Sequence, residues 1–412
     1  QTTGVCGNVS ACATVTVTVN PNPTPTASNN GPLCEGQTLN LSSTPNGMNY
    51  SWSGPGGWTS SSQNPSRAGV TTAMAGNYTV TVTSGAGCTA TATTNVVINP
   101  NPTPTASNNG PLCEGQTLNL SSTPNGMSYS WSGPGGWTSS IQNPSRLSVT
   151  TAMAGNYTVT VTSGAGCTAT ATTNVVINPN PTPTASNNGP LCEGQTLNLS
   201  STPNGMSYSW SGPGGWTSNS QNPSRAGVTT AMAGNYTVTV TNGATGCSAT
   251  ATTNVVINPN PTPTASNNGP LCEGQTLNLS STPNGMNYSW SGPGGWTSSS
   301  QNPSRAGVTT AMAGNYTVTV TSGAGCTATA TTNVVINPNP TPTASNNGPL
   351  CEGQTLNLSS TPNGMSYSWS GPGGWTSSIQ NPSRLSVTTA MAGNYTVTVT
   401  SGAGCTATAT TN

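Results

Sequence analysis

Residues 77–84 read NYTVTVTS. Tyr78, Val80 and Val82 alternate with threonines, so an extended strand would be apolar on one face and hydroxylated on the other. A period of two predicts a β-strand with one buried face. Because no stretch of the chain has a helical period, we expect an all-β protein.

The stretch recurs, because the whole chain repeats itself five times. Steps of 79, 79, 80 and 79 residues separate its equivalent cysteines, Cys34, Cys113, Cys192, Cys272 and Cys351. A fixed period of this length predicts one small domain per copy. The expected repeats are 21–99, 100–178, 179–258, 259–337 and 338–412, the fifth truncated at its last strand, and residues 1–20 are expected to be the last strands of a divergent preceding domain.

Within one copy, further alternating stretches predict about seven short antiparallel strands. QTLNLSS places Leu39 and Leu41 on one face, and MNYSWSG places Met48, Tyr50 and Trp52 on one face. The turn sequences TPNG, GPGG and SGAG separate the strands. This pattern is typical of an immunoglobulin-like β-sandwich with Trp52 in its core, whereas Trp58 either caps the core or stands at the surface.

Composition excludes whole classes of function. The 412 residues contain no His, Lys, Asp or Phe, and their only charges are five Glu and five Arg. Each repeat therefore has one carboxylate, whereas general acid–base catalysis needs two positioned groups, so we expect no enzyme, no cofactor and no metal site. The zero net charge predicts no nucleic-acid partner. No apolar run is long enough to span a membrane, so we expect no membrane contact in this region.

The twelve cysteines predict disulfides formed in an oxidising compartment. Two of them recur in every repeat, so we expect one bridge within each repeat; buried free thiols are the alternative. Cys6 and Cys12 precede the repeats, and their pairing is left open. The expected pairs are Cys34 with Cys88, Cys113 with Cys167, Cys192 with Cys247, Cys272 with Cys326, and Cys351 with Cys405.

The segment GNYTVTV, at 76–82, is similar to the tyrosine-corner segment of immunoglobulin-like domains. The fuller pattern, from NPNPTPTAS through GPLCEGQTLNLSS and YSWSGPGGW to AGNYTVTVTSGAGCTATATTNVVINP, resembles the tandem immunoglobulin-like or PKD-like repeats of secreted surface proteins of Bacteroidota. The resemblance covers residues 20–412. It implies export and a role in adhesins, surface filaments, stalks or spacers.

We therefore expect an extracellular, cell-surface, structural protein of bacterial type. Proline-rich linkers such as VVINPNPTPTAS are semi-rigid, so the array is expected to be a stiff, disulfide-stapled rod that forms the shaft of a filament or large adhesin. Its expected partners are other copies of itself, neighbouring fibres or surface glycans. The alternatives are a multivalent carbohydrate-binding array using Trp58, a spacer of a secreted enzyme, and a fibre subunit joined by strand exchange.

The copies differ at one informative place. Where the first repeat has Ser62 and Ala68–Gly69, the second and fifth have two bulky apolar residues, Ile141 with Leu147 and Ile379 with Leu385. We expect these four side chains to form small exposed patches for lateral contact between rods or for a docking partner. The alternative interpretation is drift followed by duplication.

Overall fold

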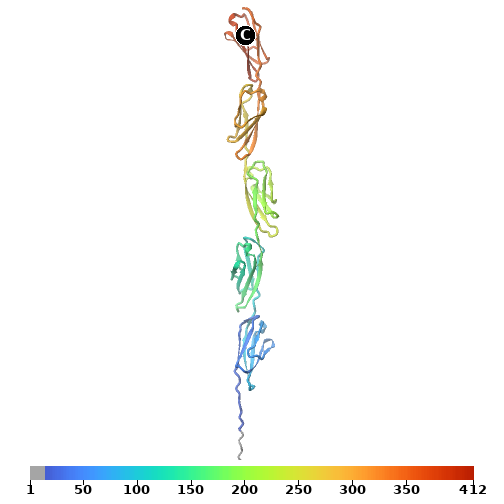
Figure 1. Ribbon diagram of the computed structural model, residues 1–412, viewed down its shortest axis with the longest axis vertical. Coiled ribbons are helices and arrows are strands. Elements are labelled where there is room, and N and C mark those ends of the chain that lie inside the picture. Colours follow the sequence, from blue (N-terminus) through green and yellow to red (C-terminus); the bar gives the residue numbers. More distant parts are fainter. Residues whose placement is uncertain (1–13) are drawn as a thin grey trace, which may run out of the picture. The chain divides into compact units, whose positions relative to one another are not determined.

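The computed structural model describes residues 14–412, and this part of the chain is all-β, as the sequence predicts (Figure 1). The first repeat contains β1 (Thr26–Asn29), β2 (Leu33–Cys34), β3 (Leu39–Thr44), β4 (Asn49–Gly54), η1 (Pro55–Gly57), β5 (Trp58–Ser60), β6 (Ser66–Arg67), η2 (Thr72–Met74), β7 (Gly76–Thr83), β8 (Thr89–Val96) and β9 (Ile98–Asn99).

The next three repeats have the same elements in the same order. The second runs from β10 (Thr105–Asn108) to β18 (Ile177–Asn178), the third from β19 (Thr184–Asn187) to β27 (Ile257–Asn258), and the fourth from β28 (Thr264–Asn267) to β36 (Ile336–Asn337). The fifth runs from β37 (Thr343–Asn346) to β43 (Thr406–Thr411). The two-residue strands β2, β6 and β9 raise the number of strands above the seven expected.

Each repeat is a sandwich of two main sheets. In the first, β1-β3-β6 faces β5-β4-β7-β8, and a third, small sheet pairs β2 with β9 in parallel. The parallel pair places Leu33 opposite Ile98 and Cys34 opposite Asn99. The second and last strands of a repeat therefore run side by side in the same direction.

The core consists of the apolar faces that the alternation predicts. In the first repeat, Leu39 and Leu41 from one sheet pack against Trp52, Tyr78 and Val80 from the other, and all five are 0–2% exposed. Trp52 is opposite Val80 in the ladder and donates its indole N–H to a backbone carbonyl, so its one polar group is satisfied. The expectation of a core tryptophan is confirmed, and the other repeats have equivalent clusters.

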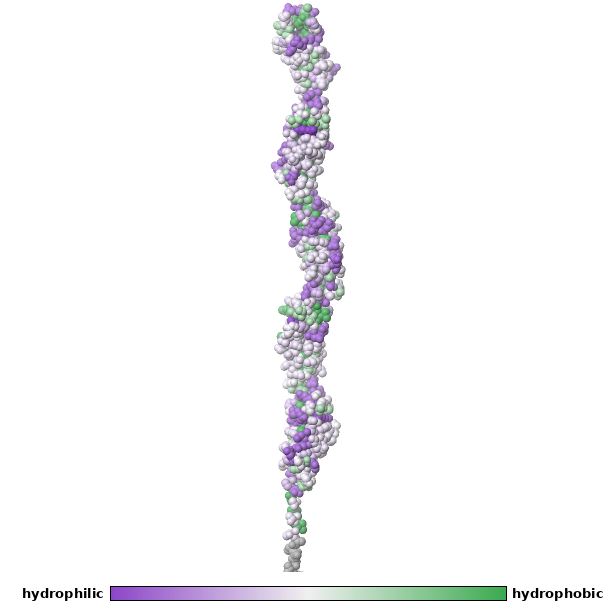
Figure 2. Space-filling view, viewed as in Figure 1, coloured by the Kyte–Doolittle hydropathy of each residue, from purple (hydrophilic) through white to green (hydrophobic). Residues whose placement is uncertain are grey.

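The surface is mostly hydroxyl and amide groups, and many of these pair across strands. Thr26 shares a hydrogen bond of 2.7 Å with Thr44, and Thr79 shares one of 2.9 Å with Thr93. Such cross-strand pairs stabilise a sheet without charges. Figure 2 accordingly shows a hydrophilic to neutral surface with only small hydrophobic spots.

By contacts, the chain divides into two compact units. One comprises residues 1–181 with 241–249, and the other residues 182–240 with 250–412. The first includes the turn between the last two long strands of the third repeat, so the units do not coincide with the repeats, and the repeat boundaries stay a prediction. Cys6 and Cys12 lie outside the described residues, and residues 14–20 form no strand.

One glycine in each repeat is required by a close approach. A Cβ on Gly54 would lie 2.4 Å from Cε1 of Tyr78, a distance that no real contact allows. Gly54 therefore lets the tyrosine ring pass over the end of β4, which fixes the ring at the edge of the core.

We predict that alanine at this position destabilises every repeat. Because the ring cannot move without losing its packing, replacing Gly54, Gly133, Gly212, Gly292 and Gly371 by alanine should cost about 1–3 kcal/mol per repeat. Thermal unfolding of the full chain measures this. The control replaces Gly85, Gly164, Gly243, Gly323 and Gly402, where a Cβ meets nothing within 4 Å, and an equal loss in both variants would contradict the prediction.

Candidate functional site: cysteine bridges between repeats

The cysteines of this chain link neighbouring repeats to one another. Each of four bridges joins the first cysteine of one repeat to the second cysteine of the next, with Cα atoms 5.5 Å apart. The bridges are Cys34–Cys167, Cys113–Cys247, Cys192–Cys326 and Cys272–Cys405. The expected pairing within repeats, Cys34 with Cys88 and its equivalents, is therefore wrong, although the prediction of disulfides is right.

The reason is the parallel pair at the edge of the sandwich. Cys34 lies opposite Asn99, at the end of the last strand, whereas Cys88 precedes the start of β8. Eleven residues of extended chain separate Cys88 from Asn99, so the two cysteines of one repeat lie about 35 Å apart. A disulfide needs Cα atoms within about 7 Å, so only the next repeat can supply the partner.

Hydrogen bonds fix the segment that carries Cys34. The backbone N–H of Cys34 donates to Oε1 of Gln37 at 2.8 Å, and the N–H of Glu35 donates to the carbonyl of Asn99 at 3.1 Å. The side chain of Asn101, in the linker, donates to the carbonyl of Glu35 at 3.1 Å. The linker is thus attached to the loop that carries the bridge. Sequence reasoning missed these roles of Gln37, Asn99 and Asn101, although their recurrence beside the first cysteine was the available signal.

Glu35 closes the same loop from the other side. Its carboxylate accepts hydrogen bonds of 3.1 Å from the backbone N–H and from the hydroxyl of Thr72. These bonds, the backbone one first, lower the pKa of Glu35, and the Thr230 backbone N–H likewise lowers the pKa of Glu193. The one carboxylate of a repeat therefore braces the bridge loop.

The second cysteine of a bridge sits in the turn between the two long last strands. Cys167 is 1% exposed, and its N–H donates to Oγ of Ser163 at 3.2 Å. Its sulfur lies 3.9 Å from the carbonyl oxygen of Asn99, the residue that ends the preceding repeat. The third repeat has an extra residue, Thr245, in this turn, yet its Cys247 forms the same bridge.

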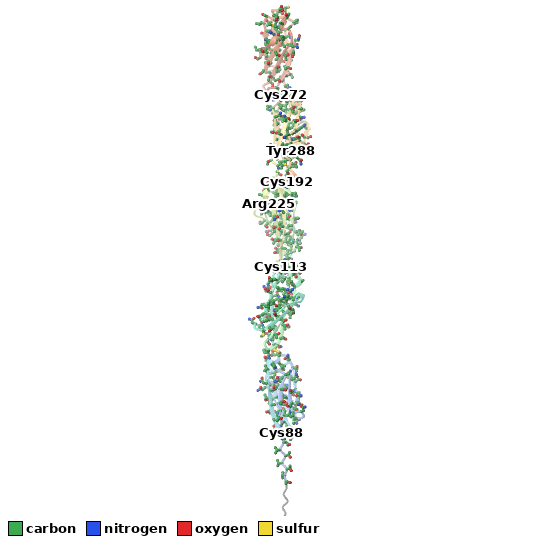
Figure 3. The ribbon with its side chains drawn as sticks, turned by 90° about the vertical axis from the view of Figure 1, so that its left-hand side faces the viewer. Cys88, Cys113, Cys192, Arg225, Cys272 and Tyr288 are labelled. Carbon is green, nitrogen blue, oxygen red and sulfur yellow. A yellow bond between two sulfur atoms is a disulfide. The ribbon has the colours of Figure 1, made fainter. Side chains whose placement is uncertain are left out.

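Two described cysteines are unpaired, Cys88 and Cys351. Cys88 is half-buried, and its sulfur lies 3.6 Å from the carbonyl oxygen of Asn20, as the paired Cys167 lies beside Asn99. In Figure 3, Cys88 lies at the end of the first repeat where the leading segment enters, and Cys113 lies at the opposite end of the second repeat. In these repeats, as in the four bridges, the second cysteine lies at the end where the chain enters and the first cysteine lies at the end where it leaves.

A cluster of Arg67, Tyr78 and Trp58 closes the core at one end. The Tyr78 hydroxyl donates to the carbonyl of Met74 at 3.0 Å and accepts from Nη1 of Arg67 at 2.9 Å. Trp58 packs edge-on against Tyr78, with ring centroids 5.5 Å apart, and the Arg67 guanidinium lies 5.8 Å from the Trp58 ring centroid. The tyrosine-corner expectation is confirmed, and Trp58 caps the core.

The expected contact residues are all exposed. Ile141 and Leu147 are 62% and 72% exposed, and Ile379 and Leu385 are 64% and 71% exposed. Beside Leu147, Ser148 has a φ of 50°, in the left-handed region where the first repeat has Gly69 with a φ of 61°. The second and fifth repeats thus carry these apolar side chains together with a less favourable backbone residue.

The fifth repeat has a groove of about 750 Å³, lined in part by Leu350, Leu356, Val387 and Tyr395. In the first repeat, Ile98 of β9 pairs beside Leu33 in the corresponding place and is buried there. The groove is thus the position of a strand in this fold.

Among residues 14–412, no three acidic or cysteine side chains come together in a way that would hold a metal ion. The same residues include no helix with the length and apolarity needed to cross a membrane. The four bridges are therefore the chemically distinctive feature of the part of the chain that the structure describes.

Comparison with known families supports the domain type. The PKD-like domain matches residues 99–177, 258–336 and 337–412, which is more than half of the chain. The chain belongs to the PKD-like domain family. PKD-like and immunoglobulin-like repeats are typically structural modules without catalytic activity, and with four disulfides they suggest an extracellular protein. No curated protein matches this PKD-like chain.

Solved structures resemble the PKD-like array at the level of its fold. The N-terminal eight Ig domains of Down Syndrome Cell Adhesion Molecule are 15% identical, with a TM-score of 0.28, and the alignment covers 92% of this chain and 66% of that one. An I-band fragment of titin is 14% identical, with a TM-score of 0.33 and coverage of 57% and 99%. TM-scores this low carry no conclusion about what the protein does.

We predict that trypsin separates the unfolded, unreduced chain into two disulfide-linked sets. Cleavage after the five arginines gives six fragments, 1–67, 68–146, 147–225, 226–305, 306–384 and 385–412. Bridges between neighbouring repeats link the first, third and fifth fragments, and separately the second, fourth and sixth. Thiol-blocked digestion in urea followed by intact-mass measurement should therefore show two products. Bridges within repeats would instead link all six fragments into one, and the reduced sample is the control.

Proposed function

We propose that this chain is part of the structural shaft of an extracellular surface filament or large adhesin. The observation that carries the proposal is the set of bridges between consecutive repeats, which join separate domains rather than stabilising each one alone. Such bridges persist in oxidising, extracellular surroundings and restrict how far one domain can separate from the next.

The linkers support the same role. Asn101 and Asn99 bond the start of the linker to the loop after β2, and the prolines that follow favour an extended chain. The surface hydroxyl pairs keep a nearly uncharged protein hydrated, so its solubility depends little on salt. A shaft exposed to changing surroundings benefits from both properties.

A multivalent carbohydrate-binding array is the second candidate function. Sugar rings stack on open aromatic faces, and Trp58, which is partly buried, directly follows the Pro55–Gly57 turn. Its ring lies against Tyr78 and near the Arg67 guanidinium, and it packs on the core, which disfavours this use. Binding of the chain to a glycan array, lost when the five equivalent tryptophans are replaced, would favour it.

The shaft proposal predicts where the protein is found. In cells that produce it, immunogold electron microscopy with antibodies to the repeats should label fibres outside the cell envelope, and a gene deletion should remove both label and fibres. An impermeant maleimide should label the bridge cysteines of intact cells only after reduction. Label confined to the cytoplasm, or bridge cysteines that react without reduction, would contradict the proposal; the unpaired Cys88 and Cys351 are expected to react in either state.

We also propose that the apolar patches, Ile141 with Leu147 and Ile379 with Leu385, mediate lateral contact with a second copy of the chain. Their exposure, and their recurrence on the same segment of the second and fifth repeats, support this. Scattered exposed apolar residues are common, but here two occur together and twice.

Replacing these four residues with the serine and alanine of the first repeat should loosen the bundling of chains at high concentration without lowering their melting temperature. Light scattering and calorimetry measure the two effects. The matched control makes the opposite change in the fourth repeat, Ser300→Ile with Ala306→Leu, and should increase association. Unchanged association in both variants would contradict the proposal that these residues mediate lateral contact.

A further inference from the structure

The bridges and the chain segments between them form two continuous covalent paths. From Cys34 the first path crosses to Cys167, follows 25 residues of chain to Cys192, crosses to Cys326 and follows 25 more to Cys351. The second path uses the other two bridges: it crosses from Cys113 to Cys247, follows 25 residues to Cys272 and crosses to Cys405. No cysteine belongs to both.

The two paths use the same two edges of the second, third and fourth repeats. In the second repeat, the first path follows the last strands from Cys167 to β18, and the second path follows the first strands from β10 to Cys113. These edges lie side by side, since Leu112 pairs with Ile177 in parallel and Asn108 donates to the Thr173 hydroxyl at 2.7 Å. Both paths therefore cross a repeat in one direction, in contact with each other.

We infer that these two paths carry tension along the chain and shield the rest of each repeat from it. Two repeats, from Cys34 to Cys192, hold 158 residues and would reach roughly 540 Å if fully unfolded. The covalent path between the same residues is one bridge plus 25 residues, which reaches only about 90 Å. Two folded repeats measure roughly 70–80 Å in summed length, so the path becomes taut before a core can open.

The differences among the copies follow this division. The segments that join two cysteines along the paths, 167–192, 247–272 and 326–351, and the equivalent segment 88–113, are identical except that Ser248 replaces threonine. The segments that the paths bypass run from the first to the second cysteine of each repeat, for example 34–88 and 113–167. They contain all the other substitutions and the inserted Thr245. They also contain the left-handed Ser148. Changes that weaken a sandwich are tolerable where no tension reaches it.

This property goes beyond the proposed shaft, because it follows from the pairing alone and would hold in an array with another role. It also makes extensibility depend on redox state. Reduction opens the paths, after which tension reaches the cores and each repeat unfolds as a unit.

Single-molecule pulling on the full chain tests the inference. One handle is an N-terminal tag and the other is coupled by a thioether to the exposed Cys351, with Cys6, Cys12 and Cys88 changed to serine. The oxidised molecule should lengthen without any step of repeat size. After reduction, repeats one to four should unfold in separate steps of roughly 230 Å each, the extended length of 79 residues less the folded length.

Two double variants distinguish load-bearing from ordinary stabilisation. Cys34→Ser with Cys167→Ser breaks the path between the handles, and the shortest covalent route should lengthen by about 110 residues, or roughly 370 Å. Cys113→Ser with Cys247→Ser removes a bridge of nearly equal loop length from the other path, with sequence separations of 134 and 133, and should give no added length. Repeat-sized steps in the oxidised parent, or equal gains in both variants, would overturn the inference.

Discussion

The parallel pairing of β2 with β9 is the constraint on which the rest of the array depends. By placing Leu33 beside Ile98 it brings the first cysteine of a repeat to the end where the chain leaves. The second cysteine lies in the turn at the opposite end, beside the residue that ends the previous repeat. Given these two positions, each bridge must join a repeat to its neighbour.

A repeat this small and this poor in charge depends on a few well-placed groups. The tryptophan and tyrosine of the core each direct their one polar atom to a backbone carbonyl, and the single arginine contacts the tyrosine hydroxyl and the tryptophan ring. The single glutamate braces the loop that carries the bridge. The arginine of a repeat thus helps to close the core, and the glutamate holds the loop that carries the bridge.

The sequence predicted the sandwich well, because period-two alternation is a local property of each strand. Tyr78, Val80 and Trp52 are buried as their alternation requires. The bridge partners were predicted wrongly, because a repeat offers the same two cysteines to itself and to its neighbour. Only the distance across the folded sandwich distinguishes the two choices. In the fold, Cys34 lies in β2 beside the end of β9, whereas Cys88 precedes β8, and the length of β8 keeps the two apart.

The distance between the two cysteines of a repeat also orders the events of maturation. In an unfolded chain, the loop from Cys34 to Cys88 is less than half as long as the loop from Cys34 to Cys167, so it closes more readily. A folded sandwich holds the first pair apart and leaves only the neighbour within reach. Oxidation after folding therefore favours the bridges between repeats, whereas an oxidant acting on the nascent chain favours bridges within a repeat, which thiol–disulfide exchange must then rearrange.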